Sequence, residues 1–388
     1  MDDKAPPARA AAVTDVVGAR LESLTSMRFI AAAMVFLYHS VHFTRIPVLN
    51  ALSAIGFEGV GFFFVLSGFV LTWSWRPADT AGGFYRRRFA RVFPLYLVTT
   101  VAAIGVLHVE GRRLQVSVLI ACLLLVQAWI PVDAGRYYYG LNAVSWSLSC
   151  EAFFYACFPV LRRLLGELSV AALLRRGIVI VAVLVTVWAT ISATTHGPTR
   201  SDLLYINPAY RIGEFALGVL LALAMRQGWR LRMSMPLAMT LGAAGLALTA
   251  AVNELGTRHH QSALVLDHSD GTVITLPIWL LLVAAGASCD VEARRTLLHQ
   301  PWFVRLGQWS YALYLVHQLV LRVAVHQWHG ITTGSLPERV VAEALLAIAC
   351  VAASGVLHVG IERPLERRLR GTRPRTEDAP PVPDPPHV

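Results

Sequence analysis

The sequence predicts an all-α fold, a polytopic membrane bundle of about ten transmembrane helices with one further re-entrant or broken helix. The 388 residues are 55% hydrophobic and only 15% charged, and their mean hydropathy is +0.54. The apolar residues form runs close to the length that a helix needs to cross a bilayer, and arginines cluster between the runs. A soluble core cannot hide this much apolar surface, so the protein is expected to be integral to the membrane.

Apolar runs that span or nearly span the bilayer occur eleven times along the chain. They cover residues 24–43, 57–75, 92–109, 116–131, 143–161, 177–195, 209–225, 235–252, 272–288, 308–325 and 338–360. Arginine clusters between the runs indicate the cytoplasmic side, because cytoplasmic loops carry an excess of positive charge. These clusters lie within residues 76–91, 162–176, 226–232, 294–295 and 363–375.

Three apolar runs lie between the first two arginine clusters, so one run should not cross if both clusters are on the same side. The run 143–161 is the best candidate, because it carries Glu151 among several hydroxyl groups and ends near a proline. Irregular backbone at membrane depth is tolerated where protein or water covers its polar groups. Ten crossings then remain and both termini are cytoplasmic, although Arg112 and Arg113 fall on the outer side in this topology.

One membrane domain is expected over residues 21–370, between disordered cytoplasmic tails at residues 1–20 and 371–388. The net charge of +10 does not indicate nucleic-acid binding, because the arginines sit in the short clusters typical of cytoplasmic loops. A loop at residues 253–272 is rich in histidine and aspartate but lacks the spacing of metal ligands, so no metal is predicted. Its residues are His259, His260, Asp267, His268 and Asp270.

The first apolar run places two ionisable residues inside a predicted transmembrane helix. Arg28 and His39 are eleven positions apart, about three helical turns, so their side chains face nearly the same way and lie roughly 16 Å apart along the axis. Charged groups are costly in hydrocarbon, and such a pair indicates a functional site. The structural alternative is that Arg28 reaches the cytoplasmic interface and His39 packs between helices.

A second pair of basic residues stands at the start of the third apolar run. Arg88 and Arg91 are three positions apart in the segment YRRRFARVFPLYL, so both can face one ligand. Planar guanidinium groups suit phosphate, which they bind through two parallel hydrogen bonds. The alternative, that these arginines only set the topology, applies most to Arg86 and Arg87.

A carboxylate lies among hydroxyl groups in the fifth apolar run. Ser147, Glu151 and Tyr155 follow one another at four-residue steps, so on a helix they share one stripe. Glu151 is either a hydrogen-bonded structural anchor or a group that handles protons. Cys150 beside it is a conceivable nucleophile, but no neighbouring charge is assured to activate its thiol.

Two further polar groupings lie in later apolar runs. Arg211 and Glu214 are three positions apart, and an ion pair within one helix is the simplest account of them. Tyr311, Tyr314 and His317 follow at three-residue steps in WSYALYLVHQ and form another polar stripe on a helix that should be buried.

Together these motifs resemble the acyltransferase 3 family of bacterial membrane O-acyltransferases, which move an acyl group from coenzyme A to a sugar or similar hydroxyl. The matching segments are Arg28 with His39, FFFVLSGF from Phe62, Arg88 with Arg91, WSLSCEAFFY from Trp146, SYALYLVH from Ser310 and IERP from Ile361. The resemblance covers nearly the whole chain between the tails. Gly61 departs from the pattern, since many members carry an aspartate or another polar residue there, and Glu58 is the acidic residue nearby.

The resemblance implies a catalytic set of His39, Glu151 and Arg28, with His39 receiving the proton of the acceptor hydroxyl. It implies that Arg88 and Arg91, with Arg28 as a further candidate, bind the phosphates of acyl-coenzyme A, most simply acetyl-coenzyme A, which enters from the cytoplasm. Glu151 would orient His39 or bind the acceptor. Tyr155 or Ser147 would stabilise the thioester oxyanion, and Arg211 and His317 would be further substrate-binding or supporting residues. Direct transfer and transfer through an acyl-enzyme both stay open.

The implied partners are the lipid bilayer, acyl-coenzyme A and a sugar-bearing acceptor, and the implied location is the plasma membrane of a bacterium. The acceptor is a sugar, a glycolipid, a polysaccharide or a glycosylated small molecule such as a macrolide, in which case O-acetylation modifies an antibiotic. The competing class is a proton-coupled exporter, because charged groups facing an intramembrane cavity serve that function equally.

Overall fold

A computed structural model describes residues 20–130, 140–258, 268–328 and 330–370. Within these ranges the chain forms α-helices with short 3-10 and π-helical turns, and no strand occurs among them. The all-α class is therefore as predicted. The predicted tails lie outside the described residues apart from Arg20, and so do His259, His260 and Asp267 of the polar loop.

Ten long helices make up most of the described chain. They are α2 (Glu22–Thr44), α4 (Gly59–Ser74), α5 (Ala81–Val109), α8 (Trp146–Leu165), α9 (Val170–Thr194), α11 (Pro208–Arg226), α12 (Met235–Arg258), α13 (His268–Val291), α14 (Pro301–Gln327) and α16 (Leu336–Leu357). Nine belong to spans apolar enough to cross a membrane, and α14 is the exception because it carries a polar stripe and two arginines. The shorter helices are α3 (Pro47–Ser53), α6 (Val116–Leu123), α10 (Pro198–Ser201), α15 (Gly330–Thr333) and α17 (Arg363–Leu369). The protein is a multi-pass membrane bundle.

The run whose helix is too short to cross is a different one from the run predicted. Residues 143–161, assigned from the sequence to a re-entrant or broken helix, lie in a 3-10 turn and in the continuous 20-residue helix α8. The run 116–131 instead forms only the eight-residue α6 and one 3-10 turn among its described residues. Eight residues rise about 12 Å, far short of a hydrocarbon core of about 30 Å. The predicted break in this helix is absent, because Glu151 finds a hydrogen-bond partner, Tyr155, within the continuous α8.

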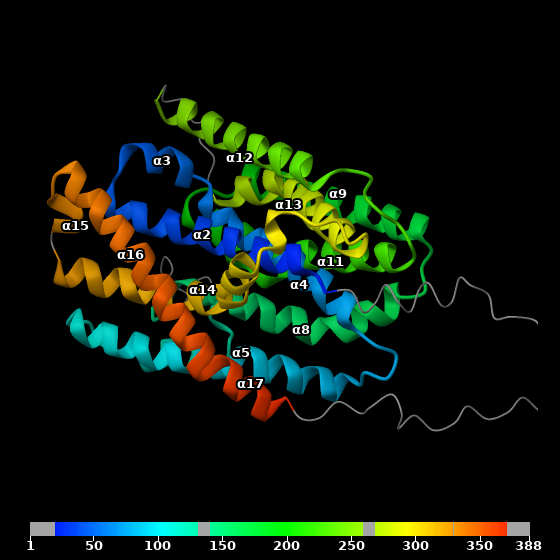
Figure 1. Cartoon of the computed structure of the whole chain (residues 1–388), viewed down its shortest axis with the longest axis horizontal. Helices are drawn as coiled ribbons and strands as arrows, with labels where there is room; N and C mark the ends of the chain where they lie inside the picture. Colours follow the sequence, from blue (N-terminus) through cyan, green and yellow to red (C-terminus); the bar gives the residue numbers. More distant parts are fainter. Residues whose placement is uncertain (1–19, 131–139, 259–267, 329, 371–388) are drawn as a thin grey trace, which may run out of the picture.

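Burial divides the helices into a centre and a periphery. In the spans of α4 and α11, 83% of the residues are buried, against 11% in the span of α9. Figure 1 shows α2 and α4 inside the bundle, with α12 on one side, α5 on the other, and α16 crossing obliquely in front. Apolar side chains such as Ile178 on α9 and Val356 on α16 are 70% and 71% exposed. These faces meet lipid tails in a bilayer, where exposed apolar surface has no cost.

The two most buried spans cross at glycines. A Cβ on Gly68 of α4 would lie 2.0 Å from the carbonyl oxygen of Phe215, and one on Gly218 of α11 would lie 2.0 Å from that of Val65. Only a residue without Cβ permits this approach of the two backbones. Gly68 of α4 and Gly218 of α11 therefore form the close contact between these two helices.

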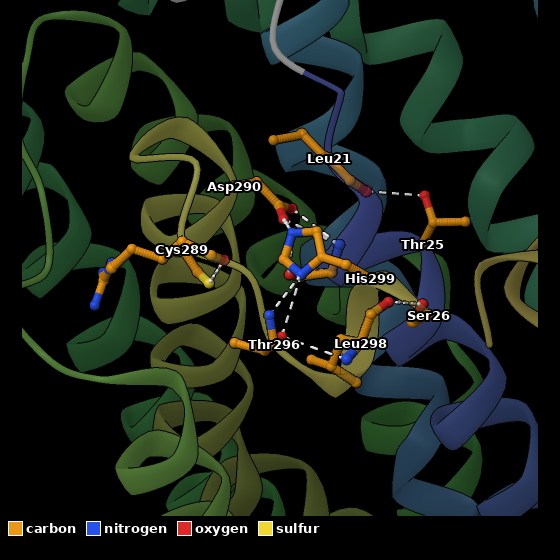
Figure 2. A network of polar contacts seen from close by, with 10 residues as sticks. Leu21, Thr25, Ser26, Cys289, Asp290, Thr296, Leu298 and His299 are labelled. Atoms are coloured by element: carbon orange, nitrogen blue, oxygen red, sulfur yellow. Dashed lines mark hydrogen bonds and ion pairs between the residues drawn. The ribbon is translucent and has the colours of Figure 1, made fainter. Parts of the chain in front are cut away.

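The start of α2 is held by a polar network at the end of α13 (Figure 2). The Asp290 carboxylate accepts a hydrogen bond from the backbone N–H of Ser23 at 3.1 Å and lies 2.9 Å from Nε2 of His299. The Thr296 N–H donates to Nδ1 of His299 at 3.1 Å, so the ring hydrogen of a neutral His299 sits on Nε2 and faces Asp290. A negative charge at a helix N-terminus is favourable. The network anchors the helix that carries Arg28 and His39.

Candidate active site

Two cavities lie beside α2, one towards each of its ends. The first, called the arginine cavity, measures about 150 Å³ and is lined by residues that include Arg28, Arg88, Arg91, Ser147, Glu151 and Tyr155. The second, called the histidine cavity, measures about 490 Å³ and is lined by residues that include His39, Tyr38, Trp146, Tyr205, His268 and Gln318. Val60 and Tyr314 line both cavities, which therefore lie back to back. The structure places His39 in the histidine cavity and most of the other predicted site residues in the arginine cavity.

The guanidinium groups of the arginine cavity differ in their partners. Arg91 forms ion pairs with Glu362 and, at 2.9 Å, with Glu366, two carboxylates of the C-terminal helical turns. Neither Arg28 nor Arg88 pairs with a carboxylate anywhere in the described part of the chain, and Nε of Arg88 is buried without a hydrogen bond. Arg28 and Arg88 are therefore the cations of this cavity that remain available to an anionic ligand.

Glu151 faces the arginine cavity with the two residues predicted to share its stripe. Tyr155 donates a hydrogen bond to the Glu151 carboxylate at 2.7 Å, and Ser147 lines the same cavity one turn earlier on α8. The stripe is therefore present. No contact joins Glu151 to His39 among the described residues, so Glu151 is not placed to orient that ring. It instead lines the same cavity as Arg28 and Arg88.

The hydrogen bonds of His39 select one tautomer. Its Nδ1 lies 2.8 Å from the carbonyl oxygen of Val35 and 3.3 Å from Nε2 of His317. A carbonyl only accepts, so Nδ1 of neutral His39 carries the ring hydrogen. His317 Nδ1 lies 3.1 Å from the carbonyl of Leu313 and carries its hydrogen for the same reason. The lone pair on Nε2 of His39 stays available to the histidine cavity, where it can accept a proton.

Aromatic rings form a wall of the histidine cavity. The Tyr38 hydroxyl lies 2.9 Å from Nε2 of His268, and the Tyr205 ring centroid lies 5.0 Å from that of His268 and 4.9 Å from that of Trp146. Such rings suit a flat or ring-bearing ligand. The sequence did not reveal this wall, because its members come from α2, α8, α13 and the turn before α11. No signal in the sequence joins segments so far apart.

An ion pair stands beside this aromatic wall. Arg322 on α14 donates from Nε and Nη2 to the two carboxylate oxygens of Glu110 at 2.8 and 2.7 Å, and from Nη1 to the Leu141 carbonyl at 2.5 Å. These hydrogen bonds hold the pKa of Glu110 below its usual range. Glu110 therefore stays charged at neutral pH and ties the end of α5 to α14.

Arg211, predicted as a supporting residue, lines neither cavity. It is fully buried, pairs with Glu214 at 3.1 Å and donates to the Thr272 hydroxyl at 2.5 Å. The predicted ion pair within the helix is therefore present, and its contacts are those of a structural pair. A Cβ on Gly61 would lie 2.9 Å from the Glu214 carboxylate. The glycine makes room for an acidic group supplied by α11.

Cys150, the conceivable nucleophile, has no access to either cavity. The residue is fully buried, and its thiol donates to the carbonyl oxygen of Ile206 at 3.3 Å. Within the described residues there is also no group of three or more His, Cys, Asp or Glu side chains that could hold a metal. Of the polar loop, Asp270 forms an ion pair with Arg200.

Ten long helices around two back-to-back polar cavities describe a polytopic membrane protein with a buried site. Residues 21–358 match the family model described as an acyltransferase domain, so the protein is a membrane acyltransferase. The chain belongs to the acyltransferase 3 family, the one that its motifs resemble. It is similar to Acyltransferase MdmB of Streptomyces mycarofaciens, with 34% identity over 385 residues that cover 92% of this chain and 94% of that protein. No solved structure matches the chain.

Proposed function

We propose that the protein moves an acyl group, acetyl in the simplest case, from acyl-coenzyme A to a hydroxyl of a sugar-bearing acceptor. The observation that carries this proposal is the pairing of two chambers with different chemistry. One holds the unpaired guanidinium groups of Arg28 and Arg88, and the other receives the available Nε2 of His39. An anionic donor and a hydroxyl acceptor require this combination.

The donor enters from the cytoplasm and the acceptor from the opposite side. The arginine cavity lies at the end of the bundle where the arginine clusters of residues 86–91 and 363–370 occur, and such clusters indicate the cytoplasmic side. Ten crossings return the chain to its starting side, so both termini are cytoplasmic at a bacterial plasma membrane. The histidine cavity then opens towards the outer side.

The phosphates of the donor bind Arg88 and Arg28. Arg91, the other member of the pair predicted from the sequence, is occupied by Glu362 and Glu366 and braces α5 against the C-terminal turns. A cavity of about 150 Å³ suits the narrow pantetheine arm rather than the nucleotide. The nucleotide therefore stays at the cytoplasmic mouth while the thioester reaches inwards.

His39 acts as the general base. Its Nε2 removes the proton of the acceptor hydroxyl as the hydroxyl oxygen attacks the thioester carbonyl carbon. The carbonyl of Val35 and Nε2 of His317 then stabilise the imidazolium through its Nδ1 hydrogen. The carbon–sulfur bond breaks, and the leaving thiolate takes up the proton. We propose direct transfer, in which Cys150 takes no part because it lines neither cavity.

The substitution His39→Ala tests this function. Transfer of labelled acetyl from acetyl-coenzyme A to alkyl glycosides or glycosylated macrolides should fall about 100- to 10,000-fold, the usual contribution of a general base. Binding of acetyl-coenzyme A by the same protein in lipid nanodiscs should persist, because His39 lies in the other cavity. If correctly inserted His39→Ala protein transfers acetyl at the wild-type rate, His39 is not the general base.

A proton-coupled exporter is the second candidate, because polar cavities at opposite ends of a bundle also suit alternating access. Detergent-solubilised protein has no membrane across which a proton gradient could drive export. An acyltransferase still forms acetylated product there, whereas an exporter forms none and keeps its flux in vesicles when His39 is replaced by Gln. Membership of an acyltransferase family favours the enzyme.

The acceptor is ring-bearing in this proposal, because Tyr38, Trp146 and Tyr205 line the histidine cavity. Glycolipids, surface polysaccharides and glycosylated macrolides all meet that description. Mass spectrometry of the lipids and secreted metabolites of a deletion strain separates them, since the true acceptor loses the mass of one acyl group.

A further inference from the structure

The two reactants of the proposed reaction enter separate chambers, yet they must meet. An ester bond forms only when the acceptor oxygen comes within about 3–3.5 Å of the thioester carbon. The arginine cavity and the histidine cavity have two lining residues in common, Val60 on α4 and Tyr314 on α14. These two side chains therefore belong to the partition that the reaction has to cross.

Tyr314 contacts or adjoins the polar groups on both sides of the partition. Its hydroxyl donates to the carbonyl oxygen of Val144 at 3.0 Å and lies 2.9 Å from Oγ of Ser147, which lines the arginine cavity. Its ring centroid lies 6.1 Å from that of His317, whose Nε2 is 3.3 Å from Nδ1 of His39. The Tyr314 side chain thus extends from Ser147 on α8 to His317, which contacts His39.

Of the two shared residues, Tyr314 is the one able to move. Val60 is β-branched and lies on a helix, where its side chain has one strongly preferred rotamer. The Tyr314 ring turns about two bonds, and its hydroxyl is held by hydrogen bonds that a ligand oxygen can replace. Val60 therefore fixes the partition on the α4 side, whereas Tyr314 on α14 can move.

We propose that Tyr314 is the gate between the two chambers. While its hydroxyl is hydrogen-bonded to Val144 and Ser147, Tyr314 keeps the arginine cavity and the histidine cavity separate. When the donor arrives, the thioester carbonyl takes over the hydrogen bond of the Tyr314 hydroxyl, the ring swings aside, and the thioester meets the hydroxyl activated by His39. This inference rests on the proposed function and adds to it a control of when the chambers join.

The gate protects the thioester from water. With the partition open and no acceptor present, water in the histidine cavity takes the place of the acceptor hydroxyl. The water oxygen bonds to the carbonyl carbon, the carbon–sulfur bond breaks, and the products are a carboxylic acid and free coenzyme A thiol. His39 carries one water proton to the leaving thiolate, so this leak depends on His39.

Thiol release from acetyl-coenzyme A in the absence of acceptor tests the gate. The full chain is used in nanodiscs, without glycoside detergents that could accept the acetyl group. Tyr314→Ala should raise the rate at least about tenfold, equivalent to about 1.4 kcal/mol of barrier. Tyr314→Phe keeps the ring but loses the hydrogen bonds of the hydroxyl, so it should raise the rate of thiol release less. Adding His39→Ala to either variant should return the rate to that of the wild type.

The matched control is Tyr96→Phe. Tyr96 is a buried tyrosine on α5 that lines neither cavity and donates to the Cys122 carbonyl at 2.7 Å. Its loss of a hydroxyl should leave acceptor-free thiol release at the wild-type rate. Rates within twofold of the wild type for both Tyr314 variants would overturn the gate, and Tyr314→Phe decides alone if Tyr314→Ala does not fold.

A separate measurement distinguishes failure of the gate from failure of the proposed function. Wild-type protein that does not bind acetyl-coenzyme A would remove the proposed function and the gate together. Wild-type protein that binds the donor and acetylates a glycoside, while Tyr314 variants show no leak, would remove the gate alone.

Discussion

Buried charges in this bundle fall into two groups according to their partners. Arg211 is neutralised by Glu214 and Arg91 by Glu362, so each pair offsets the cost of removing its charges from water. Arg28 and Arg88 have no carboxylate partner in the described residues, although both face a cavity. A charge left unpaired inside a membrane protein is expensive and indicates a ligand site.

This division predicts different consequences for two neighbouring arginines. Arg88→Ala should weaken acetyl-coenzyme A binding about 10- to 100-fold, because a hydrogen bond to a charged group contributes about 1.5–3 kcal/mol. Arg91→Ala should chiefly destabilise the fold, because it removes the guanidinium group that pairs with the buried Glu362 and with Glu366. Calorimetric titration and thermal unfolding of the same samples measure both effects.

Arg86 supplies the control for this comparison, because it lies on the same helix, is exposed and lines neither cavity. Arg86→Ala should bind the donor as the wild type does. An equal loss of affinity in the Arg86 and Arg88 variants would mean that general positive charge, rather than a phosphate contact, holds the donor.

At the scale of helices, the centre of the bundle depends on one close crossing. The α4 and α11 backbones meet at Gly68 and Gly218, and this approach brings Glu214 of α11 to Gly61 of α4. Helix association in lipid depends on such packing, because burying apolar surface gives little advantage there. The same α4 supplies Val60 to both cavities, so the crossing also positions the partition.

A methyl group at this crossing should be destabilising. Gly218→Ala places a Cβ 2.0 Å from the Val65 carbonyl oxygen and forces the two helices apart, at a cost of about 1–3 kcal/mol. Gly105→Ala on α5 is the matched control, because no atom lies within 4 Å of the added group. Thermal unfolding monitored by tryptophan fluorescence should show a lower midpoint for the first variant only. Equal midpoints would show that the crossing tolerates separation.

At the scale of the whole molecule, the proposed function assigns each substrate to one chamber and so to one side of the membrane. The arginine cavity and the histidine cavity lie towards opposite ends of α2 and share Tyr314 and Val60. In this proposal a cytoplasmic donor serves an acceptor on the other side of the membrane.

Cysteine labelling in a cysteine-free background tests this topology. Ala143→Cys and Gly166→Cys flank α8 and should label from opposite sides of the membrane, because that helix is continuous and long enough to cross. Arg113→Cys and Ile130→Cys flank the short α6 and should label from the same side. If the α8 pair labels from one side and the α6 pair from opposite sides, residues 143–161 are the re-entrant segment, as the sequence predicted. Intact cells with a membrane-impermeant maleimide report the side.

Local features of the sequence were sufficient to predict much of this protein. Hydropathy predicted the membrane class and ten of the eleven apolar runs became long helices, because helix formation and burial in lipid depend on residues close in the chain. Spacing likewise predicted the stripe of Ser147, Glu151 and Tyr155 and the pair of Arg211 with Glu214, since residues three or four apart share a helix face.

Contacts between distant segments were decided only by the tertiary structure. The motifs placed Arg28 and His39 on one face of α2, but the packing of α4, α8 and α14 put a partition between them. The same packing paired Arg91 with Glu362, joined His39 to His317 and gathered the aromatic wall. Membrane residence and candidate chemistry follow from local pattern, whereas the arrangement of that chemistry depends on side chains that the sequence separates by hundreds of residues.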